Sequence, residues 1–153
     1  MTKPKGVTVM RALTIHQPWA SAIALGTKKI EMRSWATRYR GPLLIHAGRK
    51  KLSPEGIALA GVEKMLGRFN ADRIPFGALI AIAELVDCQP TEELALTRHP
   101  IEGYWGDFSP GRFGLILKDV RAFAEPIGYR GSQGLFNVPT EVVAAQIDAL
   151  EAA

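Results

Sequence analysis

The chain has 153 residues, of which 47% are hydrophobic and 22% are charged. This length and composition predict a folded domain with a buried core and exclude a wholly disordered chain. No apolar stretch reaches the roughly 18 residues that cross a membrane, and no apolar signal segment follows the first residues. The single cysteine, Cys88, cannot form an intrachain disulfide. We therefore expect a cytoplasmic protein without a membrane partner.

The net charge of +4 is distributed unevenly along the chain. Residues 1–51 contain eleven Lys or Arg and a single acid, Glu31, whereas the remainder contains eight basic and fourteen acidic residues. An asymmetry of this size predicts a basic surface that attracts polyanions. A solvated basic face without a partner is the alternative, but Trp35 and Tyr39 lie among the basic residues and favour a nucleic-acid ligand.

Residues 1–6 are predicted to form a disordered tail, and the first half of the domain follows it. Pro18 suits the first turn of a helix, and Gly26 suits its end. Ser53 is a good N-cap, with Pro54 at the first helical position. The apolar patterning predicts strands over 7–15, 30–35 and 42–47 and helices over 18–25 and 54–66.

The second half continues after a polar connection over 69–76. Thr91 is expected to cap a short helix, and Thr140 is expected to open the C-terminal one. The remaining pattern predicts strands over 77–87, 112–120, 120–127 and 135–138, a loop over 99–112 and a glycine-rich loop over 128–134. Because strands and helices do not alternate regularly, we expect an α+β fold with an antiparallel barrel or curled sheet. Residues 7–153 are predicted to form a single domain.

The strand predicted over 30–35 carries more charge than a core strand usually does. Glu31 lies among Lys28, Lys29 and Arg33, which indicates that one face of this strand meets a ligand. Glu84 interrupts the most apolar strand, where an unpaired carboxylate would be costly. We expect its partner to come from the segment 28–33, and a purely structural ion pair is equally compatible with the pattern.

No cofactor site is evident. The three histidines, His16, His46 and His99, lie far apart and match no zinc or calcium spacing, and no phosphate-binding glycine motif is present. Ser132 lies in the glycine-rich loop, whose backbone N–H groups would suit an anion. A tight turn that simply requires glycine explains the same residues.

Several segments together resemble the ASCH domain, from about residue 11 to 139. The similarity is carried by His16-Gln17-Pro18-Trp19-Ala20-Ser21, Gly26-x-Lys28-x-x-Glu31-x-Arg33-Ser34-Trp35, Arg40-Gly41 and Leu44-Ile45-His46-Ala47. The resemblance implies a PUA-like fold, a small mixed or antiparallel β-barrel of five to six strands with flanking short helices. It also implies a cleft beside the first helix and RNA or other nucleic-acid binding.

Some members of this family are enzymes. One branch hydrolyses acetylated cytidine with a lysine, a threonine three residues later and a glutamate on a later strand. Lys28 and Glu84 match the lysine and the glutamate, but Glu31 replaces the threonine and cannot act as a hydroxyl nucleophile. Ribonuclease activity is also associated with ASCH proteins.

The leading hypothesis is a module that binds single-stranded RNA or a modified nucleobase in a basic cleft. A hydrolase of RNA or of a modified nucleoside is the alternative, with Lys28, Glu31 and Glu84 as its catalytic residues. A protein ligand for the same cleft is the third hypothesis. The predicted nucleic-acid-binding residues are Lys28, Lys29, Glu31, Arg33, Trp35, Arg38, Tyr39, Arg40, His46, Arg49, Lys50 and Ser132.

Overall fold

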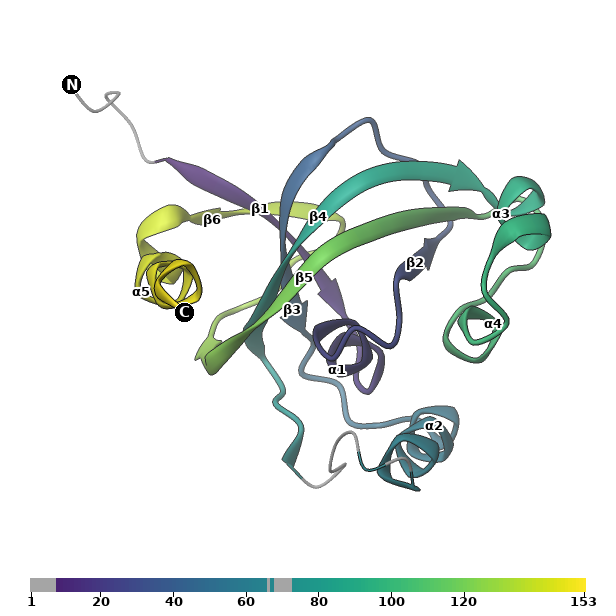
Figure 1. The fold of residues 1–153 in the computed structure, drawn as a ribbon, viewed down its shortest axis with the longest axis horizontal. Helices are drawn as coiled ribbons and strands as arrows, with labels where there is room; N and C mark the ends of the chain where they lie inside the picture. The colour runs from purple at the N-terminus through teal and green to yellow at the C-terminus, as the bar shows by residue number, and fades with distance from the viewer. Residues whose placement is uncertain (1–7, 66, 68–72) are drawn as a thin grey trace.

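A computed structural model describes residues 8–65, 67 and 73–153 of the chain (Figure 1). The predicted tail over 1–6 and the first half of the connection over 69–76 lie outside these residues. The strands are β1 (Val9–Ile15), β2 (Ile30–Arg33), β3 (Gly41–Ala47), β4 (Ala78–Pro90), β5 (Phe113–Gly128) and β6 (Leu135–Pro139). The helices are α1 (Trp19–Ala24), α2 (Pro54–Met65), α3 (Thr91–Thr97), α4 (Glu102–Trp105) and α5 (Thr140–Ala152).

The six strands form one mixed sheet with the order β2-β5-β4-β3-β1-β6. Strands β1 and β3 are parallel, and every other neighbouring pair is antiparallel. The expected α+β fold with short flanking helices is confirmed. The expected barrel needs correction, because β2 and β6 stand at opposite ends of the strand order and the described sheet is not closed into a barrel.

Strand β5 is a single strand of 16 residues, where the sequence predicted two. Asp119 has a left-handed φ of 52°, and the pairing with β4 shifts register at three places. Such irregularities bend a strand and increase its twist without ending it. The polar pair Lys118-Asp119 therefore marks a bend in one strand.

Two further corrections concern the helices. Pro90, and not Thr91, is the N-cap of α3, and α4 lies within the predicted loop over 99–112.

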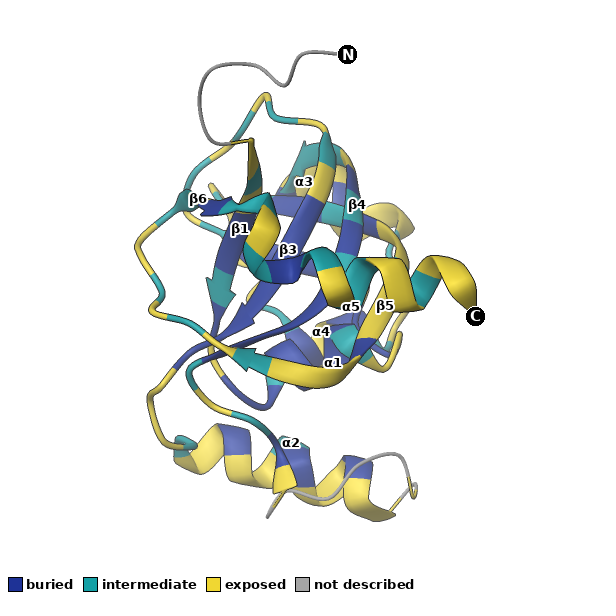
Figure 2. Ribbon diagram, turned by 90° about the vertical axis from the view of Figure 1, so that its left-hand side faces the viewer, coloured by how far each residue is buried: buried dark blue, intermediate teal, exposed yellow. Residues whose placement is uncertain are grey.

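Alternating side chains of the sheet build a core on each of its faces. In β1, Leu13 and Ile15 join the core beneath α1, whereas Ala12 belongs to the core beneath α5. Strand β3 divides in the same way between Leu43 and Leu44. This two-residue period explains why the central strands are buried on both sides (Figure 2). Helix α2 presents most of its surface to solvent (Figure 2).

The glycine-rich loop over 128–134 is fixed to the sheet by a buried histidine. His46 is 1% exposed, its Nε2 lies 2.7 Å from the carbonyl oxygen of Tyr129, and its Nδ1 lies 3.0 Å from Thr14 Oγ1. A carbonyl oxygen only accepts, so Nε2 carries the proton and Nδ1 accepts from the Thr14 hydroxyl. A Cβ at Gly131 would lie 2.5 Å from Thr14 Oγ1 and 2.8 Å from His46 Cε1. Glycine is therefore needed at position 131 for close approach.

We expect Gly131→Ala to destabilise the domain by about 1–3 kcal/mol, because the methyl group would have to displace a buried hydrogen-bonded pair. The measurement is the free energy of unfolding in denaturant. Gly128→Ala is the matched control, since no atom lies within 4 Å of a Cβ there. Equal stabilities of the two variants would contradict this account of the loop.

Candidate functional site

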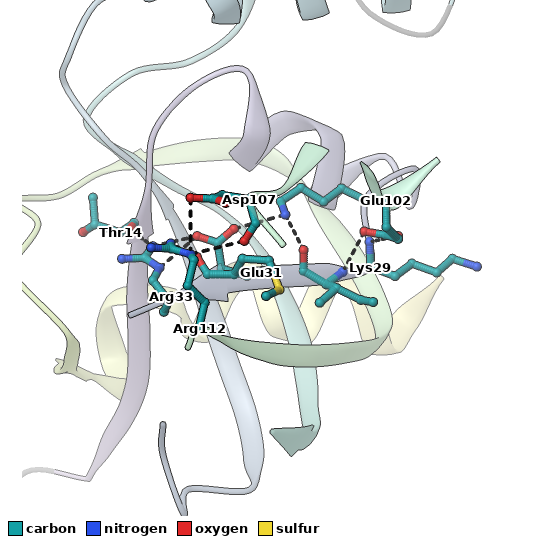
Figure 3. Close-up of polar contacts among 10 residues, drawn as sticks. Thr14, Lys29, Glu31, Arg33, Glu102, Asp107 and Arg112 are labelled. Carbon is teal, nitrogen blue, oxygen red and sulfur yellow. Dashed lines mark hydrogen bonds and ion pairs between the residues drawn. The ribbon is translucent and has the colours of Figure 1, made fainter. Parts of the chain in front are cut away.

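Strand β2 lies at the edge of the sheet, and side chains cover its free backbone groups (Figure 3). Glu102 accepts hydrogen bonds from the backbone N–H groups of Lys29 (2.9 Å) and Ile30 (3.2 Å). The Lys28 ammonium donates to the Ile30 carbonyl oxygen. An uncovered edge would be a template for pairing with another strand. These contacts instead fix β2 as a rigid wall.

Glu31 is the centre of an ion-pair network on this strand. Lys28 Nζ lies 3.2 Å from Glu31 Oε1, and Arg33 Nη2 lies 2.8 Å from Glu31 Oε2. Arg33 also donates from Nε to Glu31 Oε2 and from Nη2 to the Thr14 carbonyl oxygen. Lys28 is 1% exposed and Glu31 is 8% exposed. The carboxylate is thus held between a fully buried cation and a half-buried one.

A pocket of about 520 Å³ opens over Glu31 and Arg33. Strands β1 and β2, helices α1, α2 and α4, and the segment before β5 all contribute to its walls. Its lining residues are Thr14, Ile15, His16, Trp19, Glu31, Met32, Arg33, Glu55, Leu59, Tyr104, Trp105, Gly106, Asp107 and Arg112. We call this the β2 pocket.

Aromatic side chains from two helices line the β2 pocket. Trp19 comes from α1, and Tyr104 and Trp105 come from α4. Trp105 is buried, whereas Tyr104 is 68% exposed. The pocket therefore has a fixed aromatic wall and an accessible phenol ring near its opening, an arrangement suited to a flat ligand.

The charged groups of the β2 pocket nearly cancel. Arg33 and Arg112 face three acids, Glu31, Glu55 and Asp107. The side-chain hydroxyl and backbone N–H of Ser109 donate to Asp107 and lower the pKa of that carboxyl. This lining differs from the basic cleft that the sequence predicted.

Of the predicted site residues, only Glu31 and Arg33 line the β2 pocket together. Lys28 lies behind Glu31, where its buried ammonium is held by Glu31 and by the Ile30 carbonyl. Lys29 is exposed and lines a different pocket. The expected group of adjacent cations is therefore divided among three environments.

A second group of predicted residues lies away from the β2 pocket. Trp35 packs against the core, and the Tyr39 hydroxyl donates to the Pro42 carbonyl oxygen. Burial raises the pKa of Tyr39, and the nearby Glu84 carboxylate adds to the shift. Arg40 pairs with Asp87 at 3.4 Å. Arg38, like Arg40, is exposed.

Glu84 does not lie with Lys28, contrary to the sequence-based expectation. It lines a separate pocket together with Asp119 and Arg121, on the side of the sheet that α5 covers. Lys28, Glu31 and Glu84 thus do not converge on one reacting centre. The catalytic set of the hydrolase hypothesis is divided between two places.

Two loops with predicted residues lie next to His16 and Thr14, which line the β2 pocket. A Cβ at Gly48 would lie 3.0 Å from His16 Nδ1, which places the exposed Arg49 and Lys50 directly after the pocket wall. Ser132 is exposed and follows Gly131, which contacts Thr14. His46, by contrast, is buried beneath this loop and supports it.

Sequence reasoning missed the residues that α4 and its flanks provide. Glu102, Tyr104 and Trp105 belong to a helix of four residues inside a segment rich in Gly and Pro. The adjacent aromatic pair Tyr104-Trp105 was a usable signal, because a loop rarely exposes two large rings without a reason. Glu102 gave no signal, since its hydrogen-bond partners lie more than 70 residues away in the sequence.

Neither a metal-binding cluster nor a membrane-spanning helix occurs among the residues described. Within 8–65, 67 and 73–153, no group of three or more His, Cys, Asp or Glu side chains is arranged to hold a metal ion. No helix of those residues combines the length and apolar character needed to cross a bilayer.

The fold of this chain has counterparts among solved structures. ASCH from Zymomonas mobilis superposes with a TM-score of 0.57 and 16% identity, covering 92% of this chain and 94% of that one. A single-substitution variant of the same protein superposes with a TM-score of 0.55 and 14% identity, covering 90% of this chain and 96% of that one. At these identities the likeness establishes the fold alone.

The family model described as "ASCH domain" matches residues 13–132, and the chain belongs to the ASCH domain family. Among curated proteins, human Activating signal cointegrator 1 is 39% identical over 80 residues, and the mouse protein of the same name is 38% identical over 80 residues. Each match covers 50% of this chain and 14% of the relative. The chain therefore matches only about one seventh of the length of these relatives.

We expect Glu31→Gln to destabilise the fold by about 3 kcal/mol or more, because it leaves the Lys28 ammonium buried without its counter-ion. Denaturant unfolding measures the loss. The double variant Lys28→Met/Glu31→Gln should recover part of it, since the uncompensated charge is then gone. Asp87→Asn, which breaks the exposed pair with Arg40, should cost no more than about 1 kcal/mol and is the control. If Glu31→Gln and Asp87→Asn lower the free energy of unfolding by similar amounts, the buried ion pair contributes no more to stability than the exposed one.

We expect acidification to weaken the fold through His46. Burial lowers the pKa of His46 below the ordinary value of 6.5, although the hydrogen bond to the Tyr129 carbonyl opposes the shift. The unfolded chain therefore binds a proton more readily, so this contribution to stability is complete above pH 6.5 and is lost as the pH falls through the folded pKa. Unfolding free energies from about pH 7.5 to about pH 5 measure it. His46→Gln should flatten the pH dependence of the unfolding free energy. An unchanged slope in that variant would show that the dependence comes from a group other than His46.

Proposed function

We propose that this domain binds single-stranded RNA, with one unstacked base inserted in the β2 pocket. The observation that carries the proposal is the combination, in one pocket of about 520 Å³, of the Glu31–Arg33 pair with three large aromatic side chains. Specific recognition of single-stranded RNA uses the same elements, namely ring stacking and hydrogen bonds to base edges. Small-molecule sites span about 300–1,000 Å³, so the volume suits a base, modified or not, with its sugar.

The polar groups of the pocket wall supply both kinds of hydrogen bond. Arg33 uses Nε and Nη2 for Glu31 and Thr14, and its Nη1 makes no hydrogen bond within the described part of the chain. This nitrogen can donate to a base oxygen or ring nitrogen. Glu31 keeps acceptor capacity, because an ionised carboxylate has about four lone-pair positions. A base that offers a donor beside an acceptor matches this wall.

Phosphate groups would bind outside the β2 pocket. The nearly neutral lining gives no net attraction to a phosphodiester, whereas Arg49 and Lys50 are exposed on the turn next to His16. We therefore assign recognition of the base to the β2 pocket and contacts to the RNA phosphates to Arg49 and Lys50. Such phosphate contacts make affinity fall with rising salt.

We expect Tyr104→Ala to weaken binding of a short unstructured RNA roughly tenfold to a hundredfold, because a stacked base is worth about 1–3 kcal/mol. Fluorescence anisotropy with a labelled oligonucleotide measures the affinity. Tyr104 is 68% exposed, so its removal should leave the fold intact.

Leu96→Ala is the matched control, because Leu96 is exposed and lies outside the β2 pocket. Its RNA affinity should equal that of the unchanged protein. If Tyr104→Ala binds RNA as tightly as Leu96→Ala, no base stacks in the β2 pocket and the proposal fails.

A further inference from the structure

A second pocket lies at the start of strand β2. It has the cationic character that the β2 pocket lacks. Its volume is about 620 Å³. It is lined by the start of β2, the end of α3 and the middle of β5, around Ile30, Leu94 and Leu117. We call it the α3 pocket. None of the residues that line it lines the β2 pocket.

Three cations and one acid line the α3 pocket. The cations are Lys29, Arg98 and Lys118, and the acid is Asp119. Ion pairs among the described residues include none of these three cations. The pocket thus presents positive charge that the described part of the chain leaves without a carboxylate partner.

The backbone holds the two segments that carry the lysines side by side. Leu117 N–H donates to the Lys29 carbonyl oxygen at 2.9 Å, and Lys118 is the next residue. On its other side, the Lys29 backbone N–H is held by Glu102. Both lysine side chains are exposed, which leaves their ammonium groups available to a ligand.

Arg98 is a partly buried guanidinium with few partners. It lies 4.8 Å from the centre of the Phe108 ring, and its Nη1 makes only two long contacts of 3.4 Å, to the carbonyl oxygens of His99 and Pro100. Its Nε is buried and has no hydrogen-bond partner in the part of the chain described. A guanidinium whose buried Nε has no acceptor carries a desolvation cost, and an anionic ligand would add charge-assisted hydrogen bonds to its other nitrogens.

The floor of the α3 pocket is apolar, although its border is charged. Ile30, Leu94 and Leu117 are buried there, and Gln89 and Thr97 add polar groups at the side. A ligand that matches this distribution has a phosphate, a flat body of limited polarity and a few hydrogen-bonding groups. Inorganic phosphate alone would leave the apolar floor uncovered.

We propose that the α3 pocket binds a phosphorylated nucleoside unit, with its phosphate on Lys29, Lys118 and Arg98 and its base on the aliphatic floor. The unit is either a free mononucleotide or one nucleotide of a strand. This second site goes beyond base recognition in the β2 pocket and does not depend on it.

Adenosine 5′-monophosphate, adenosine and inorganic phosphate are the probes, titrated calorimetrically into the full chain. The monophosphate should bind at least tenfold more tightly than adenosine and than phosphate, because only it meets both the cations and the floor. In Lys29→Ala/Lys118→Ala its affinity should fall at least tenfold. Lys64→Ala, which removes an exposed lysine of α2, should bind it unchanged. Equal binding of adenosine and the monophosphate, or unchanged binding in the double variant, overturns the proposal.

Competition identifies the source of the unit. Displacement of the monophosphate by a short single-stranded RNA supports a strand nucleotide, and persistence of the monophosphate on the RNA-bound protein supports a free one. The result is separable from that for the β2 pocket, because Tyr104 does not line the α3 pocket. A failure of Tyr104→Ala to weaken RNA binding would leave the monophosphate titration unaffected.

Discussion

The carboxylate of Glu31 lies between the buried Lys28 ammonium and the Arg33 guanidinium, and the position of strand β2 depends on this arrangement. Because Lys28 is almost completely buried, it requires a counter-ion, and Glu31 supplies it at 3.2 Å. Arg33 then ties the same carboxylate to the backbone of β1 through the Thr14 carbonyl oxygen. One acid thus joins an edge strand of only four residues to the opposite half of the sheet.

The same strand separates two pockets of different charge. Ile30 and the preceding Lys29 face the α3 pocket, whereas Glu31 and Arg33 face the β2 pocket. The division runs along the strand, because the consecutive residues Glu31, Met32 and Arg33 all line the β2 pocket, and a single short element thus serves both sites. Glu102 holds the backbone at the division between them. A rigid strand is a better support for recognition than a flexible loop, because less order has to be gained on binding.

Membership of the ASCH family and the similarity to the Zymomonas mobilis protein concern the fold. A fold hosts many functions, so the assignment of ligands must come from side chains in the pockets. Here the aromatic wall of Tyr104 and Trp105 and the unpaired cations of the α3 pocket are the features that distinguish the two sites. Tyr104, Trp105, Arg98 and Lys118 all follow position 90, outside the motifs that first indicated the family, whereas Lys29 lies within them.

The sequence by itself determined the order of most elements, the α+β class and the central importance of Glu31. Local rules suffice for these features, because strand alternation, a helix-opening proline and an excess of charge on one strand can all be read over a few residues. The same rules divided β5 in two at Val120, next to the left-handed Asp119, because such a bend cannot be distinguished from a turn unless the partner strand is known.

Only the tertiary structure decided which charges are available to a ligand. Lys28 and His46 look accessible in the sequence, but packing buries both and uses them to support β2 and the glycine-rich loop. Glu84 was assigned to the Lys28 segment, yet it lies on the other side of the sheet. The contacts that fix these outcomes join residues dozens of positions apart. Burial is a property of the assembled fold, and no local pattern of residues specifies it.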